Sequence, residues 1–187
     1  MRLVVTEFIT LDGVIEDPGG SEKSPFGGWA FKFPRGAEGD KFKLEELMAA
    51  DAQLFGRKTY EGFAEAWPSR TDDVGFAERI NSLPKYVVSS TLQRADWTNS
   101  TILRGNVVDE ITRLKQQPGR DILLAGSAQL VQTLAQQQLV DEYRLMVFPV
   151  VVGSGKRLFS EGLPTTSMKI VESQRMAEVL TLRLQPA

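Results

Sequence analysis

The chain has 187 residues, of which 42% are hydrophobic and 25% charged, and this balance predicts a single soluble domain over residues 1–187. Its net charge of -2 gives no general attraction to nucleic acid or to an anionic membrane, and its apolar runs are shorter than the roughly 20 residues of a membrane span. It contains no cysteine and no histidine, which excludes disulfides, Cys/His zinc sites and catalysis by Ser-His-Asp or Cys-His groups. We therefore expect a cytoplasmic protein with no metal, membrane or nucleic-acid partner.

A β-branched strand pattern at residues 2–8 opens the chain, and a long segment rich in glycine and proline follows at 12–39. Loops of this length are uncommon inside compact domains and usually serve as lids or binding loops. Its aromatic residues lie close together, at Phe26, Trp29, Phe31 and Phe33. They favour a loop that packs onto something over a disordered insert.

Downstream of this loop, helical and strand patterns alternate, and the chain then ends in strands alone. We predict helices at residues 40–51, 59–65, 77–83, 107–116 and 128–138. We predict strands at residues 52–55, 85–89, 100–103, 121–125, 142–152, 170–172 and 179–184. This order predicts an α/β protein of three layers: a mainly parallel mixed sheet of about eight strands, flanked by helices, with an antiparallel C-terminal hairpin. Because the run 142–152 is apolar on both faces, we expect it in the sheet centre or at a homodimer interface.

Two segments have the pattern of a buried strand, a glycine turn and a helix start: residues 54–60 and 122–127. In this geometry the backbone N–H groups of the first helical turn favour anions, above all phosphates. The first segment also contains Arg57 and Lys58, which oppose the helix dipole unless an anion binds there. The two turns predict a cofactor with several phosphates across the carboxyl ends of the strands, and surface charge at a helix start is the alternative.

A third glycine cluster, at residues 153–156, matches neither of two common phosphate motifs. A P-loop needs a glycine where Val150 stands and a Ser or Thr where Arg157 stands. A dinucleotide-binding G-x-G-x-x-G needs a glycine where Leu158 stands. We interpret the cluster as a turn after the long strand, or as a loop beside a ligand.

The segment 54–61 resembles the cofactor segment of dihydrofolate reductase, in which an apolar strand ends at glycine and is followed by Arg, a variable residue, Thr and an aromatic residue. The segments 86–90 and 122–127 resemble two later landmarks of that family, a strand with a serine-rich exit and a strand that ends in consecutive glycines. The segments 10–13 and 140–155 are more similar to the reductase (C-terminal) domain of the bacterial bifunctional riboflavin biosynthesis deaminase-reductase and its stand-alone relatives. The resemblance spans nearly the whole chain, and its specificity lies in the order and spacing of these five segments.

This resemblance implies a dihydrofolate-reductase-like fold and an NADPH-dependent reductase that transfers hydride to a small pterin-like or ribosylamino-pyrimidine substrate. The residues expected to bind NADPH are Ile15, Gly56, Arg57, Lys58, Thr59, Ser89, Ser90, Thr91, Leu124, Ala125, Gly126, Ser127, Ala128 and Gln129. The residues expected to contact the heterocyclic substrate are Asp12, Trp29, Asp40 and Leu44. The loop after the first strand would close over both ligands.

Asp40 is the expected catalytic residue, because it stands where the resemblance places the carboxylate that grips the substrate heterocycle. An N-terminal helix cap is its alternative role, since aspartate is favoured there as well. For the whole chain, the alternative is a non-catalytic nucleotide-binding or interaction protein on the same fold, because a fold alone does not establish an activity.

Overall fold

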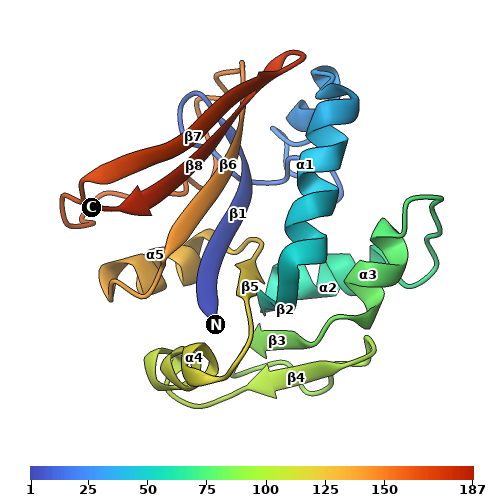
Figure 1. Ribbon diagram of the computed structural model, residues 1–187, viewed down its shortest axis with the longest axis vertical. Coiled ribbons are helices and arrows are strands. Elements are labelled where there is room, and N and C mark those ends of the chain that lie inside the picture. Colours follow the sequence, from blue (N-terminus) through green and yellow to red (C-terminus); the bar gives the residue numbers. More distant parts are fainter.

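One eight-stranded sheet, with the order β4-β3-β2-β5-β1-β6-β8-β7, forms the centre of the computed structural model, which describes all residues from Met1 to Ala187 (Figure 1). The strands are β1 (Arg2–Thr10), β2 (Ala50–Gly56), β3 (Lys85–Val88), β4 (Ser100–Leu103), β5 (Asp121–Leu124), β6 (Glu142–Phe148), β7 (Met168–Met176) and β8 (Val179–Pro186). Neighbouring strands from β4 to β6 are parallel, whereas the β6–β8 and β8–β7 pairs are antiparallel. The predicted mixed sheet with its antiparallel C-terminal hairpin is confirmed.

Helices cover both faces of this sheet, because successive side chains of a buried strand point to opposite faces. They are α1 (Gly36–Ala49), α2 (Arg57–Ala66), α3 (Phe76–Ser82), α4 (Val107–Gln116) and α5 (Ala128–Gln136). On β1, Leu3 and Val5 pack in one core with residues of α4 and α5, and Val4 packs in a second core with residues of α1, α2 and α3. The three-layer arrangement is therefore as predicted.

Some element boundaries differ from the predicted ones. Helix α1 begins at Gly36 rather than near residue 40, so its first turn contains the glycines that had indicated a loop. Strand β6 ends at Phe148 rather than at residue 152, because Pro149 has no N–H for the strand ladder. The apolar residue Val151 beyond it is 67% exposed. β6 nevertheless lies inside the sheet, between β1 and β8, which confirms the central placement expected for this strand.

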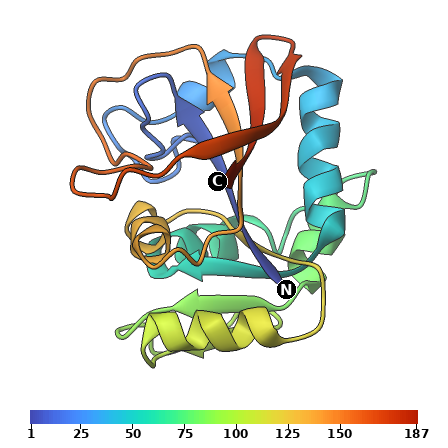
Figure 2. The same cartoon turned by 60° about the vertical axis from the view of Figure 1, so that its left-hand side comes forward.

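The segment between β1 and α1 is a loop with one short 3₁₀ helix at Trp29–Lys32. Its first part runs beside the segment that follows β6 (Figure 2), where Val14 bridges to Arg157 and the Leu11 N–H donates to the Val150 carbonyl at 2.9 Å. These contacts favour an ordered loop, but the packing expected of its aromatic residues holds only for Trp29 and Phe33, since Phe31 is 82% exposed and Phe26 47%. Among the helices, none has the length and apolar character needed to cross a membrane.

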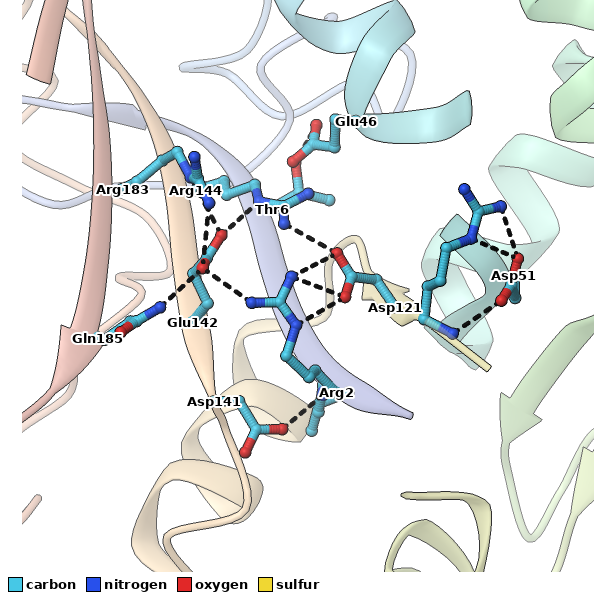
Figure 3. A network of polar contacts seen from close by, with 12 residues as sticks. Arg2, Thr6, Glu46, Asp51, Asp121, Asp141, Glu142, Arg144, Arg183 and Gln185 are labelled. Atoms are coloured by element: carbon cyan, nitrogen blue, oxygen red, sulfur yellow. Dashed lines mark hydrogen bonds and ion pairs between the residues drawn. The ribbon is translucent and has the colours of Figure 1, made fainter. Parts of the chain in front are cut away.

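The amino ends of β1, β5 and β6 carry a buried network of charged side chains (Figure 3). Glu142 is 0% exposed and accepts hydrogen bonds from Arg144 at 2.6 Å and from Arg183 at 3.2 Å. Arg144 also donates to Asp121 at 2.8 Å, and Arg2 binds both acids. Burial by itself would raise the pKa of Glu142, but the bonds from Arg144, Arg183 and Gln185 lower it to about 2. Every acidic group of this network has a cationic partner.

Candidate functional site

The predicted cofactor segments meet at the carboxyl edge of the sheet, between β2 and β5. These strands are neighbours, but the chain leaves them in opposite directions: β2 leads through α2 and α3 to β3, and β5 leads through α5 to β6 on the far side of β1. Helices α2 and α5 pack on opposite faces. Open α/β sheets bind their ligands beyond the strand ends at such a point of reversal, and we call this place the crevice.

The two glycine turns at this crevice touch one another. A Cβ added to Gly56 would lie 2.6 Å from Cβ of Ser127, and one added to Gly126 would collide with the Thr59 side chain. Gly126 also has a φ of +59°, which L side chains rarely adopt. Neither α2 nor α5 has a side-chain cap, so the amides of their first turns have no partner within the helix. Both turns can therefore bring bare backbone amides against one anionic group, which fits a pyrophosphate.

The basic residues of α2 stand at the mouth of this crevice. Arg57 and Lys58 are exposed, and Arg57 pairs with Glu61 one turn later at 3.1 Å. Lys58 makes no ion pair within the chain. The pKa of Glu16, in the loop after β1, is lowered mainly by Lys156. The charge of Lys58 lowers it a little further, so Lys58 lies near this loop. Lys58 is thus a cation without a partner beside the glycine turns, while Arg57 shares its charge with Glu61.

The remaining residues predicted to bind cofactor follow the same edge of the sheet. Ser89 is buried after β3, and its Oγ accepts the backbone N–H groups of Thr91 at 3.2 Å and Leu92 at 2.9 Å. Ser90 and Thr91 are exposed next to it. On the other side of β2, Leu124 and Ala128 lie in the same core as Ile15 of the loop. Ala125 is half-buried, Gln129 is exposed, and every peptide bond is trans, Ala125-Gly126 included.

The residues predicted to contact substrate are more scattered. Asp12 joins its loop to the segment that follows β6: it accepts hydrogen bonds from the Thr10 hydroxyl at 2.7 Å and from the Gly153 N–H at 2.8 Å. The Thr10 bond is the largest of the effects that lower the pKa of Asp12 to about 2. Trp29 is 2% exposed, packs edge-on against Phe148, and donates from Nε1 to a loop carbonyl. Leu44 is half-buried on α1. No protein contact brings these three residues together.

Asp40 lies in the second turn of α1, on its outer side. Its side chain is 63% exposed and forms an ion pair with Arg35. The alternative role as a helix cap is wrong, because the helix begins four residues earlier and Arg35 occupies the N-cap position. The catalytic role of Asp40 stays a prediction.

Sequence reasoning missed two groups of polar residues near the carboxyl end of β1. Glu7 is 8% exposed, and its Oε1 accepts the N–H of Gly126 at 2.6 Å. On the opposite face, Lys43 of α1 hydrogen bonds to both Thr6 and Glu46, and Thr6 donates to Glu46 at 2.8 Å. The signal was present in the sequence, since Glu7 is an acid inside a strand that is otherwise apolar or β-branched.

The eight-stranded sheet, its reversal between β2 and β5 and the two glycine turns define a protein of the dihydrofolate-reductase-like class. The model of the RibD C-terminal domain matches residues 2–182, so the chain belongs to this family. Among curated proteins, it is 31% identical to YyaP of Bacillus subtilis (strain 168) over 176 residues, which are 92% of this chain and 88% of YyaP. It is 27% identical to YwjB of the same organism over 174 residues, 93% of this chain and 91% of YwjB.

Solved structures agree with this fold. A protein from Shewanella sp. PV-4 named for riboflavin biosynthesis superposes with a TM-score of 0.78 at 21% identity, covering 100% of this chain and 99% of that one. RibD of Acinetobacter baumannii superposes with a TM-score of 0.65 at 16% identity. In that comparison this chain is covered completely but spans only 58% of the longer protein.

Proposed function

We propose that this protein is an NADPH-dependent reductase that transfers hydride to a small nitrogen heterocycle, with a ribosylamino-pyrimidine as the first candidate. The observation that carries the proposal is the contact between the Gly56 and Gly126 turns, with Lys58 unpaired at their mouth. Two uncapped helix starts and a free cation suit a dinucleotide with an extra phosphate better than one without it. Membership of the RibD C-terminal family and the riboflavin names of two solved relatives support the substrate class.

The chain itself provides binding and orientation. Bound NADPH would supply the hydride, and the protein would hold its phosphates at the two turns and exclude water from the reacting end. We assign Ser89, Ser90 and Thr91, at the end of β3, to the adenosine side, as the family resemblance implies; β1 lies on the other side of β2 and β5 in the strand order. Our proposed substrate side consists of Asp40, Leu44 and the loop with Asp12 and Trp29. We also propose that the protein is a homodimer in the cytoplasm and that residues 1–187 form a single domain.

The proposed cofactor preference can be tested by calorimetric titration with NADPH and NADH. We expect NADPH to bind more tightly, and the double variant Arg57→Ala/Lys58→Ala to lose most of this preference because the 2′-phosphate loses its cations. The control is Arg113→Ala/Lys169→Ala, which removes the same number of charges from α4 and β7. It should leave the affinities for NADPH and NADH unchanged. Equal affinity of the unmodified protein for the two dinucleotides would refute the preference.

The reductase activity needs a separate measurement. NADPH oxidation should be followed at 340 nm with a ribosylamino-pyrimidine and with a dihydropterin as candidate substrates. Tight NADPH binding without oxidation by any heterocycle of this class would favour a non-catalytic nucleotide-binding protein on the same fold.

A further inference from the structure

Glu7 is a buried carboxyl group that lies level with the glycine turn of the proposed cofactor site. Val5 of β1 pairs with Leu124, the last residue of β5. Two residues after each of them, Glu7 and Gly126 lie side by side. Its Oε1 accepts the Gly126 N–H at 2.6 Å. Its Oε2 has no hydrogen-bond partner within the chain. One oxygen thus fixes the side chain, and the other is free.

No cation is paired with Glu7, in contrast to three of the other four buried acids; the fourth, Asp17, accepts two backbone N–H groups instead. Asp121 and Glu142 are bound by arginines, and Glu46 is bound by Lys43. Around Glu7, the β5–α5 turn presents only a backbone amide, and β6 presents Leu145. The charged groups that affect its pKa are Lys43 and Glu46 of α1, which are already paired with each other.

A carboxylate buried without a counter-ion is costly, and such a group takes up a proton instead. Burial, the largest effect, raises the pKa of Glu7 to about 8, although the Gly126 amide and the Lys43 ammonium lower it in part. At neutral pH Glu7 is therefore mainly a neutral acid, whose hydroxyl can donate a hydrogen bond.

The position of Glu7 in the sheet relates it to the dinucleotide of the proposed function. The strand order runs from β3 on the adenosine side, past the turns of β2 and β5, to β1. A dinucleotide that follows this edge reaches Glu7 directly after its pyrophosphate has passed the Gly126 turn. At that place an ionised carboxylate would repel the phosphates, whereas the neutral acid would not.

We propose that Glu7 binds the nicotinamide end of NADPH in its protonated form, donating a hydrogen bond from Oε2 to a carbonyl oxygen of the ligand, so that cofactor binding and protonation of Glu7 are coupled. This inference rests on the proposed function, because it assumes that NADPH occupies the crevice. It assigns Glu7 a ligand-binding role that depends on pH.

The coupling predicts how affinity changes with pH. If only the protonated form binds, the dissociation constant for NADPH should rise about ten-fold between pH 7 and pH 9. The phosphate groups of the ligand are about nine-tenths ionised or more across this range, since their last pKa lies near 6. NADPH binding at pH 8 should also take up about half a proton, which calorimetry in buffers of different ionisation enthalpy measures directly.

Glu7→Gln is the decisive variant, because glutamine keeps an acceptor for Gly126 and a donor for the ligand but does not titrate. We expect it to bind NADPH equally well at pH 7 and pH 9, with no proton uptake. Glu16→Gln is the matched control: it removes an acidic group of the loop that is ionised throughout this range, and it should keep the ten-fold change.

The outcomes separate this inference from the proposed function. A constant dissociation constant and no proton uptake in the unmodified protein would overturn the role of Glu7 and leave NADPH binding intact. The same pH dependence in Glu7→Gln as in the unmodified protein would also overturn it. Absence of NADPH binding at every pH would overturn both proposals. If Glu7→Gln does not fold, proton uptake by the unmodified protein still decides.

Discussion

The two ends of the central strands bury a glutamate in opposite ways. At the amino end, Glu142 is surrounded by Arg2, Arg144 and Arg183, and its pKa is about 2. Glu7 lies toward the carboxyl end of β1, three residues beyond Val4, which pairs with Glu142. It accepts one backbone amide and has no cationic partner, and its pKa is about 8.

Burial alone therefore does not determine the protonation state of an acid. Both side chains are almost inaccessible to water, and desolvation disfavours the charge of each. At the amino end, the guanidinium groups more than compensate for this cost, so that Glu142 is ionised and its oxygens are occupied by partners within the chain. At the carboxyl edge the Gly126 amide and the Lys43 ammonium offset only part of this cost, and the second carboxyl oxygen of Glu7 is left for a ligand.

The largest expected effect is the loss of the amino-end network. Glu142→Gln leaves three arginines around a neutral side chain, and we expect the free energy of unfolding at pH 7 to fall by about 3 to 5 kcal/mol. Urea denaturation measures this loss. Glu172→Gln is the control, because Glu172 binds the same Arg183 but is 51% exposed, and its loss should cost less than about 1 kcal/mol. Equal effects of the two substitutions would show that the buried network adds nothing beyond a surface pair.

The second prediction uses the pH dependence of stability. The folded-state pKa of Glu7 lies above its ordinary value of 4.5, so the folded protein keeps a proton that the unfolded chain releases, and stability falls as pH rises from about 4.5 to 8. From pH 6 to pH 8.5 Glu7 should account for a loss of about 2.5 kcal/mol. Glu142 has the opposite sign, since its stabilising contribution is lost as pH falls from about 4.5 to 2.

Urea denaturation of the unmodified protein and of Glu7→Gln at several pH values checks both signs. The difference between the two proteins should change by about 2.5 kcal/mol between pH 6 and pH 8.5, in favour of the variant at the higher pH. Below pH 4 the two should lose stability in parallel, because Glu142 is present in both. A difference that is constant above pH 6 would contradict the raised pKa of Glu7.

The third prediction concerns Gly126, whose N–H is the one partner of Glu7. Gly126→Ala combines a positive φ with a collision against Thr59, and we expect it to cost about 2 to 3 kcal/mol and to abolish NADPH binding. Gly153 is a matched control, since it has a φ of +81° but no atom within 4 Å of an added Cβ. Gly153→Ala should cost about 1 kcal/mol, from backbone strain alone, and should bind NADPH normally. Normal NADPH binding by Gly126→Ala would remove this turn from the site.

The fold could be predicted well because its information is local. Apolar strands, glycine turns and helix patterns alternate along the chain, and their order alone indicates a parallel sheet with helices on both faces. The predictions were wrong where an element depends on pairing with its neighbour rather than on its own apolar pattern. β7 is mostly polar and exposed, and it extends over Met168–Met176 because β8 pairs with it along its whole length.

The candidate site shows the same limit. The glycines and basic residues of the two turns could be found from sequence because strand, turn and helix are contiguous there. Glu7 could be noticed as an acid in an apolar strand, but its place at the site could not be found from sequence, because its contact with Gly126 joins positions 119 residues apart. The start of α1 was also placed too late, since Gly36 and Gly39 disfavour helix by propensity, and packing of the helix on the sheet outweighs this.

The smallest expected effect on stability is that of Asp40→Asn. The ion pair between Asp40 and Arg35 is exposed, so its loss should change the free energy of unfolding by less than about 1 kcal/mol, and NADPH affinity should not change because the phosphate-binding turns lie on other elements. If Asp40 holds the substrate as predicted, turnover with a confirmed heterocycle should nevertheless fall by about a hundred-fold. Glu38→Gln, an exposed acid in the first turn of the same helix, should leave turnover unchanged. Turnover of Asp40→Asn equal to that of the control would contradict the prediction.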